Sequence, residues 1–247
     1  MRLTQAIPAG PEVTPEERYT GLDLSRLAGG DRPYVVCNFV SSLDGKATAE
    51  GRTGALASEA DRAAFHLLRT QVDALLAGTG TMRIERYGVA VRSERLSQIR
   101  LAEGRAPQPL CVVISRSGNV PFEVPLFADA RSDVVLYAPA DMTPPRCEAR
   151  LTHHEIPVGE DSLSQILRAL RRDHDVRSLL CEGGPMLFNS LLRQNLVDEL
   201  FLTVSPALVG GAELGITTGT ARDQLQVMQL VWALECRGSL FLRYTRR

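Results

Sequence analysis

Short apolar runs that end in turns alternate with segments of helical periodicity over most of this chain. Segment 162–172 shows the helical pattern, because Leu163, Ile166, Leu167 and Leu170 fall at positions i, i+3, i+4 and i+7. Strands that alternate with helices predict an α/β fold, in which a mainly parallel sheet carries helices on both faces. The expected strands are 34–40, 74–77, 110–114, 134–137, 178–181 and 199–204, and the expected helices are 58–69, 162–172 and 186–193.

The two ends of the chain depart from this alternation. Runs 227–235 and 239–244 are joined by an Arg-Gly pair and predict an antiparallel hairpin at the edge of the sheet. The N-terminal segment 1–30 carries several prolines and a Gly-Gly pair, so we expect it to be an arm draped over the domain. A chain of 247 residues can bury a full core, and we expect 31–247 to form a single domain.

Charge and hydropathy exclude several classes of function. A formal net charge of -1 gives no electrostatic reason to expect binding to nucleic acid or to an anionic membrane. No apolar run reaches the roughly 18 to 20 residues that cross a bilayer. Segment 1–30 also lacks the basic start and apolar core of a signal peptide. We therefore expect a cytoplasmic protein.

Neither a metal site nor a side-chain nucleophile is predicted. The five cysteines include no CxxC pair, and three of them lie in apolar runs, where a free thiol behaves as a small hydrophobic group. His153-His154-Glu155 fits the H-x-E start of a zinc deaminase signature, but no P-C-x-x-C follows. No G-x-S-x-G elbow occurs either. Chemistry supplied by a bound cofactor is the remaining expectation.

Two glycine-rich turns follow predicted strands, at 78–81 (GTGT) and 182–185 (EGGP). Glycine allows close approach of the backbone to a phosphate, and the free N–H groups at a helix N-terminus favour an anion. Each turn alone is better explained as a tight connection, since neither completes G-x-G-x-x-G. Two such turns in one sheet favour a dinucleotide. A third polar turn, at 41–46, also follows a strand and could face the same ligand.

Several short motifs recur in a characteristic order along the chain. They are FVSSLDGK at 39–46, DR at 61–62, LR at 68–69, DALLAGTGT at 73–81, EGGPML at 182–187, LVDE at 196–199 and SPALVGG at 205–211. In order and spacing this set resembles the RibD C-terminal reductase family, from about residue 33 to the C-terminus. The resemblance implies a dihydrofolate-reductase-like fold, NADPH as cofactor and a homodimer.

The resemblance also implies a reaction and its site. The ribosyl group of 5-amino-6-(5-phosphoribosylamino)uracil would be reduced to ribityl by hydride transfer to C1 of the opened sugar, with water as a possible proton source. The carboxylates assigned to catalysis are Glu182 and Glu85. The substrate would contact Thr53, Arg69, Arg92 and Glu182. The cofactor would contact Val40, Ala55, Gly80, Thr81, Ser115, Gly183, Gly184, Pro185, Met186, Leu187 and Phe188. From its position alone, Arg116 is a candidate partner for a 2′-phosphate, and the preference for NADPH over NADH stays open.

The sequence departs from the family pattern at two places, which leaves the substrate open. Glu85 replaces the usual aspartate, followed by Arg86-Tyr87 in place of a proline region, and Ala55-Leu56-Ala57 replaces Trp-Ile-Thr. One alternative is a related reductase of a pterin, such as dihydrofolate, or of another heterocycle. Another is a sensor that binds the nucleotide without turnover.

Overall fold

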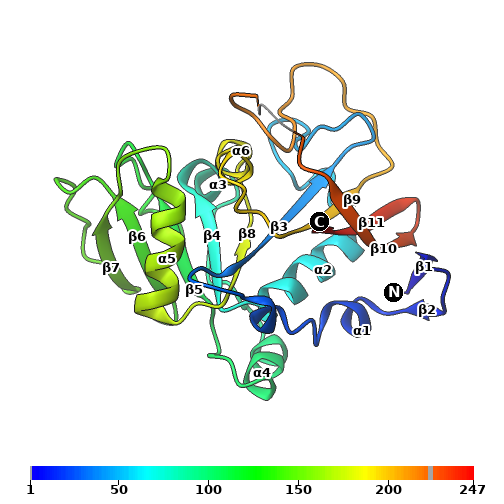
Figure 1. The fold of residues 1–247 in the computed structure, drawn as a ribbon, viewed down its shortest axis with the longest axis horizontal. Helices are drawn as coiled ribbons and strands as arrows, with labels where there is room; N and C mark the ends of the chain where they lie inside the picture. The colour runs from blue at the N-terminus through cyan, green and yellow to red at the C-terminus, as the bar shows by residue number, and fades with distance from the viewer. Residues whose placement is uncertain (1, 222–224) are drawn as a thin grey trace.

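The computed structural model describes residues 2–221 and 225–247, which form a mixed sheet of 11 strands (Figure 1). The strands are β1 Leu3–Ile7, β2 Glu12–Val13, β3 Tyr34–Ser41, β4 Ala74–Gly78, β5 Leu110–Ile114, β6 Asp133–Ala138, β7 Arg150–Glu155, β8 Ser178–Cys181, β9 Glu199–Val204, β10 Met228–Cys236 and β11 Ser239–Arg246. Their order across the sheet is β2-β1-β10-β11-β9-β3-β8-β4-β5-β6-β7.

The parallel part of the sheet is confirmed. Strands β9, β3, β8, β4, β5, β6 and β7 pair with one another in parallel. The C-terminal hairpin is confirmed as the antiparallel side, with Arg237 and Gly238 both at positive φ in its turn. The N-terminal segment adds two strands that the sequence pattern did not predict. Since β1 pairs with β10 and β2 with β1, these strands lie outside the hairpin.

Helices cover both faces of the sheet, as predicted. They are α1 Pro15–Tyr19, α2 Glu59–Thr70, α3 Thr79–Ile84, α4 Glu94–Ala102, α5 Ser162–His174 and α6 Pro185–Arg193, with the 3-10 helix η1 Leu24–Leu27. Side chains alternate across each strand, so that Val36 packs with the α2 side while Val35 and Cys37 pack with the α5 and α6 side. Two separate hydrophobic cores result, one on each face.

Helix α2 begins where the sequence predicts. Ser58 caps it, since the Ser58 hydroxyl accepts a hydrogen bond of 3.1 Å from the backbone N–H of Asp61. Ala64 and Leu68 are buried on the side of α2 that faces the sheet. The helix therefore lies along β3, with its first turn at the carboxyl end of that strand (Figure 1).

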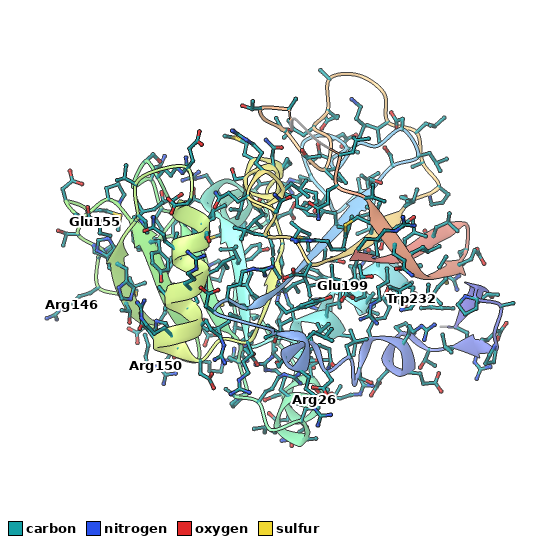
Figure 2. All side chains as sticks on the ribbon, viewed as in Figure 1. Arg26, Arg146, Arg150, Glu155, Glu199 and Trp232 are labelled. Atoms are coloured by element: carbon teal, nitrogen blue, oxygen red, sulfur yellow. The ribbon has the colours of Figure 1, made fainter. Side chains whose placement is uncertain are left out.

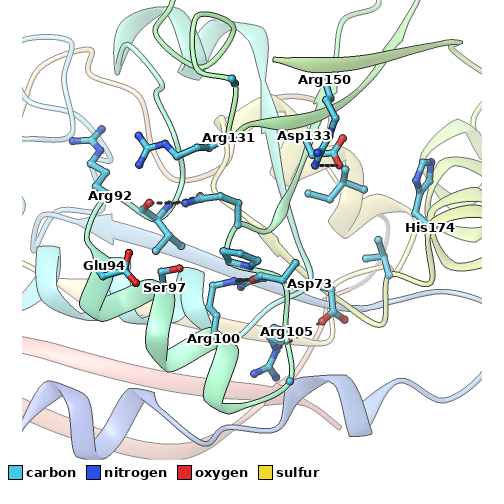
Figure 3. Close-up of a pocket in the computed structure, with 18 of the residues that line it drawn as sticks. Asp73, Arg92, Glu94, Ser97, Arg100, Arg105, Arg131, Asp133, Arg150 and His174 are labelled. Carbon is cyan, nitrogen blue, oxygen red and sulfur yellow. Dashed lines mark hydrogen bonds and ion pairs between the residues drawn. The ribbon is translucent and has the colours of Figure 1, made fainter. Parts of the chain in front are cut away.

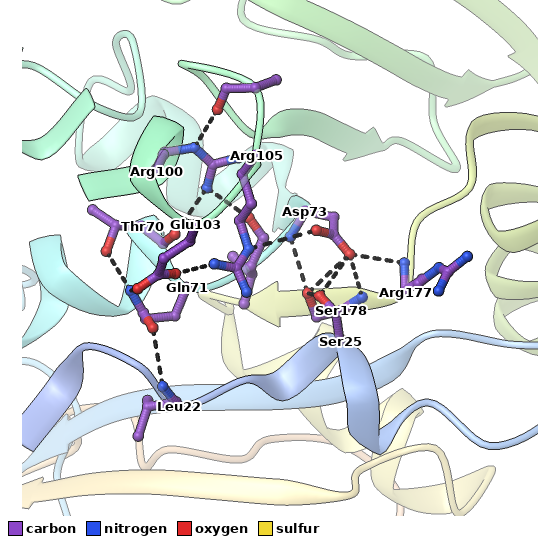
Figure 4. A network of polar contacts seen from close by, with 12 residues as sticks. Leu22, Ser25, Thr70, Gln71, Asp73, Arg100, Glu103, Arg105, Arg177 and Ser178 are labelled. Carbon is purple, nitrogen blue, oxygen red and sulfur yellow. Dashed lines mark hydrogen bonds and ion pairs between the residues drawn. The ribbon is translucent and has the colours of Figure 1, made fainter. Parts of the chain in front are cut away.

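The N-terminal segment is anchored to the rest of the protein by apolar and polar contacts. Leu3, Tyr19 and Leu24 are buried in the core on the α2 face. The rings of Tyr19 and Trp232 meet edge to face at 5.5 Å, and Trp232 lies on the hairpin side of the molecule in Figure 2. Ser25 donates a hydrogen bond of 3.1 Å to Asp73, within the network of Figure 4.

The change from parallel to antiparallel pairing occurs at β9. There Glu199, labelled in Figure 2, is fully buried, accepts a hydrogen bond from Tyr34 of β3 at 3.0 Å and forms an ion pair with Arg243 of β11. The carboxylate links the three strands across this junction. Within the described residues, no helix is long and apolar enough to cross a membrane.

Candidate active site

The two glycine-rich turns lie side by side, because they follow the neighbouring parallel strands β4 and β8. The backbone N–H of Gly78 donates a hydrogen bond of 3.0 Å to the carbonyl of Gly183. A Cβ on Gly184 would lie 2.8 Å from Thr81 Oγ1, and Gly183 has φ +95, so both positions require glycine. The first turns of α3 and α6 therefore start from one place at the carboxyl edge of the sheet.

These two helix starts lack a side-chain cap. Thr14, Ser58 and Ser93 cap α1, α2 and α4, whereas α3 and α6 begin at Gly78 and Gly184 without a capping hydrogen bond. Backbone N–H groups of the first turn consequently have no side-chain acceptor. Helix starts of this kind suit the pyrophosphate of a dinucleotide. The space beside Gly184, which a Cβ would fill, would allow the same ligand to approach the backbone.

A cavity of about 380 Å³ opens beside the turns, between α2, the carboxyl end of β3 and the loop after it. The predicted site residues that line the cavity are Val40, Thr53, Arg69, Thr81, Glu85, Arg92, Glu182, Gly184 and Pro185. The predicted residues that do not line it are Ala55, Gly80, Ser115, Gly183, Met186, Leu187 and Phe188. The structure thus brings the substrate assignments and part of the cofactor assignments into one place.

The cofactor assignments outside the cavity have different surroundings. Phe188 is buried and its ring packs on Phe39 at 4.5 Å, which makes it a support for the turn. Met186 is 73% exposed at the start of α6. Ser115 follows β5, and its buried hydroxyl has no hydrogen-bond partner among the described residues. Arg116 beside it donates a hydrogen bond of 3.2 Å to Ser162.

At the inner end of the cavity, Arg69 and Glu182 form a bidentate ion pair. Arg69 Nη1 also donates to the carbonyl of Ala90 at 3.2 Å, and the Tyr87 hydroxyl donates to Glu182. Burial lowers the pKa of Arg69, but Glu182 outweighs this and raises it overall. Burial, followed by the Glu182 charge, raises the pKa of Tyr87 well above its usual value. Arg69 therefore remains a cation, and each of its three nitrogens already donates a hydrogen bond within the protein.

Arg92 offers a different kind of guanidinium. It is exposed and lines the cavity, and within the described residues it forms no ion pair or hydrogen bond through its side chain. Across the cavity, the Thr53 hydroxyl donates to Glu85 at 2.7 Å and joins the loop after β3 to the end of α3. Among the described residues, a ligand in this cavity would thus meet the unpaired guanidinium of Arg92 and the carboxylate of Glu85, which Thr53 holds.

Two titratable residues of the cavity were missed by the sequence analysis. Asp61 and His66 lie on α2 and line the cavity together with Arg69. Burial raises the pKa of Asp61 and lowers that of His66, and the charges of Arg69 and Arg92 lower the His66 pKa further. The spacing of Asp61, Phe65 and Arg69 at i, i+4 and i+8 placed them on one helix face and was the available signal.

A larger cavity of about 880 Å³ lies at the amino ends of the parallel strands and is lined by several arginines (Figure 3). Arg131 pairs with Asp129, and Arg150 with Asp133. Arg100 is buried and donates to the carbonyls of Arg69, Thr70, Val72 and Ala106 (Figure 4). Burial lowers the pKa of Arg100 to about 10, with Arg105 adding to the effect. Arg100 therefore holds the end of α2 in place. Ligands of open α/β sheets bind at the opposite strand ends.

The described residues contain no group of three His, Cys, Asp or Glu side chains suited to a metal. The five cysteines are all free, and Cys37, Cys111, Cys181 and Cys236 are buried. The prediction of structural thiols without disulfides is confirmed.

Comparison with known proteins gives consistent matches. A model described as the RibD C-terminal domain matches residues 33–237. A protein of Archaeoglobus fulgidus named 2,5-diamino-6-ribosylamino-4(3H)-pyrimidinone 5′-phosphate reductase is 33% identical over 185 residues, covering 74% of this chain and 84% of that protein. Its namesake from Methanothermobacter thermautotrophicus is 30% identical over 186 residues, covering 74% and 82%. In fold, a pyrimidine reductase-like protein of Corynebacterium diphtheriae superposes with a TM-score of 0.79 at 21% identity, covering 95% of this chain and 99% of that one.

Proposed function

The chain belongs to the RibD C-terminal domain family, and from this premise we propose that it is an NADPH-dependent reductase of riboflavin biosynthesis. Its substrate would be a 6-ribosylaminopyrimidine 5′-phosphate, whose ribosyl group is reduced to ribityl. This class includes 5-amino-6-(5-phosphoribosylamino)uracil and the 2,5-diamino compound in the names of the relatives. The two differ only at position 2 of the ring.

The observation that carries the proposal is the pairing of the glycine turns at the mouth of the cavity. The hydrogen bond of 3.0 Å from the Gly78 N–H to the Gly183 carbonyl brings together the starts of α3 and α6, which have glycine as N-cap. Val40 and Thr81 line the cavity beside them. A dinucleotide held there by its phosphates would reach the cavity with its nicotinamide. Bound NADPH would supply a hydride to C1 of the opened sugar, and a proton taken up from water completes the reduction.

The protein's own residues would position the substrate. Arg92 would bind the 5′-phosphate, since its guanidinium has no partner in the part of the chain that the structure describes and a forked donor suits phosphate. Arg69 would hold Glu182 in place through their ion pair, and its positive charge would act on the substrate from the inner wall of the cavity. Glu85, oriented by Thr53, would accept hydrogen bonds from sugar hydroxyls as the chain opens. Ser115 and Arg116 would lie towards the far end of the cofactor, where the orphaned serine hydroxyl gains a partner.

We also propose a homodimer. Val231 and Leu240 are large apolar residues exposed on hairpin β10–β11, 38% and 39% respectively. A second copy of the chain would cover them and remove this apolar area from water. Light scattering coupled to size exclusion measures the mass directly, and a monomer at micromolar concentration would reject this assignment.

The test of the activity follows the oxidation of NADPH and NADH with the purified protein. The uracil, the 2,5-diaminopyrimidinone and dihydrofolate are offered in parallel. The proposal expects turnover of a ribosylaminopyrimidine with NADPH. Turnover of dihydrofolate alone would instead favour a pterin reductase, and NADPH binding without any turnover would favour a sensor.

A further inference from the structure

Asp61 is a buried carboxyl group that faces the cavity from helix α2. It is 7% exposed and lines the cavity from the first turn of α2. Burial raises its pKa, while a hydrogen bond from Thr203 and the charge of Arg62 lower it. Within the described residues Asp61 forms no ion pair, and the Arg62 guanidinium donates to the carbonyl of Ala57 at 2.7 Å instead. The two carboxyl oxygens of Asp61 have room for more hydrogen bonds than the one from Thr203, and a ligand in the cavity can donate them.

The helix start does not account for a carboxyl group at this position. An acidic residue in the first turn stabilises a helix from the surface, and Glu59 already does so from an exposed position. Ser58 provides the cap. A second acidic group against apolar walls loses hydration, and the first turn already has a charge from Glu59 and a cap from Ser58. The position of Asp61 is therefore better explained by a ligand that binds in the cavity.

The cavity has two chemically different ends. Asp61 and Arg69 lie eight residues apart on the same helix face, which corresponds to about 12 Å along the axis. Asp61 can accept hydrogen bonds at one end of this face, and the apolar side chains of Val40, Ala47 and Leu214 also line the cavity. The opposite end carries the Arg69–Glu182 ion pair and the exposed guanidinium of Arg92. A substrate with an anionic phosphate at one end and a donor-bearing ring at the other matches this polarity.

The two candidate pyrimidines differ in what they present to a carboxylate. A 2-amino-4-oxopyrimidine carries the ring N3–H next to the 2-amino group, so two parallel donors meet the two carboxylate oxygens. In the deaminated 2,4-dioxopyrimidine, N3–H lies between two carbonyl oxygens, and one of these would oppose the carboxylate. We propose that Asp61 binds the N3–H and 2-amino edge, so that the chain reduces the 2,5-diaminopyrimidinone before deamination. This inference rests on the proposed function.

The experiment compares the two pyrimidines on the wild-type protein and on Asp61→Asn. For each ligand it measures kcat/KM and, separately, binding by titration calorimetry without cofactor. The wild type is expected to prefer the diamino compound by about 10- to 100-fold, the range of a lost hydrogen bond to a charged group. The asparagine amide has one donor and one acceptor, so the variant should lose about tenfold or more of this preference.

The matched control is Glu59→Gln, which removes the same charge from the same helix turn at an exposed position and should leave the preference unchanged. Thermal unfolding checks that both variants fold. Comparing the two pyrimidines on the wild-type protein does not depend on the folding of any variant. If the wild type bound them equally, or preferred the uracil, the inference would be overturned. An unchanged preference in folded Asp61→Asn would also overturn it. If neither pyrimidine is reduced, the proposed function fails instead.

Discussion

Arg69 and Glu182 form a bidentate ion pair inside the protein, with Nε–Oε1 and Nη2–Oε2 distances of 2.7 Å each. The pair joins helix α2 to the glycine turn after β8, and Tyr87 donates to the same carboxylate. Because both charged groups are buried, each depends on the other for the interactions that water would otherwise provide. Glu182 is thereby fixed at the wall of the cavity.

Replacing Arg69 with alanine should destabilise the fold strongly, because it leaves the Glu182 charge buried without its partner. A loss of about 3–5 kcal/mol in the free energy of unfolding is expected, measured by urea denaturation. The double variant Arg69→Met with Glu182→Leu removes both charges and should recover much of this loss. If the double variant were less stable than Arg69→Ala, the mutual dependence of the pair would be wrong.

Replacing Gly184 with valine should weaken NADPH binding before it affects the pyrimidine. The added Cβ would lie 2.8 Å from Thr81 Oγ1 and would occupy the space between the two helix starts. We expect at least a tenfold increase in the Kd for NADPH, about 1.4 kcal/mol, by fluorescence titration. Gly29→Val, where a Cβ meets nothing within 4 Å, is the control. Unchanged affinity in folded Gly184→Val contradicts the cofactor assignment.

Replacing Arg92 with alanine should remove recognition of the substrate phosphate and leave stability unchanged, because the side chain is exposed and unpaired within the described residues. The wild type should bind the phosphorylated pyrimidine about 10-fold or more tightly than its dephosphorylated form. In Arg92→Ala this difference should disappear. Arg86→Ala, an exposed arginine outside the cavity, should retain it. A retained difference in Arg92→Ala would assign the phosphate to another group.

The buried thiols should be inert in the native protein. Burial raises the pKa of Cys111 to about 12 and that of Cys37 well above its usual value. The reactive thiolate is therefore scarce at neutral pH and increases only in strongly alkaline solution, where pH approaches these raised values. A thiol reagent at pH 7 should modify the partly exposed Cys147 first, whereas all five cysteines should react in denaturant. Rapid native modification of Cys111, located by mass spectrometry, would contradict this packing.

The sequence predicted the parallel part of the sheet well, because β3, β4 and β8 are continuous apolar runs followed by recognisable turns. It missed β7, whose residues alternate between partly buried and exposed and include few apolar side chains. It also missed α3, since six residues are too short to show a helical period. Strands β1 and β2 are short, and their pairing depends on the distant hairpin.

The parts of the candidate site that lie within short local motifs could be predicted from the sequence. Both glycine turns and Glu182 could be identified from the order of residues alone. The ion pair between Arg69 and Glu182 could not be predicted, because the two residues are 113 positions apart and neither motif indicates contact with the other. Asp61 was missed for a related reason. Its significance arises from burial beside Val40 and Thr203, which only the packing of α2 on the sheet creates.

Hydride transfer to the sugar is the central claim, and isotope transfer tests it most directly. NADPH deuterated at the transferable position of the nicotinamide is incubated with the protein and a 6-ribosylaminopyrimidine 5′-phosphate, and the product is examined by NMR and mass spectrometry. The account predicts one deuterium at C1 of a new ribityl chain. A product without deuterium at C1, or NADPH that remains unoxidised while bound, would contradict it.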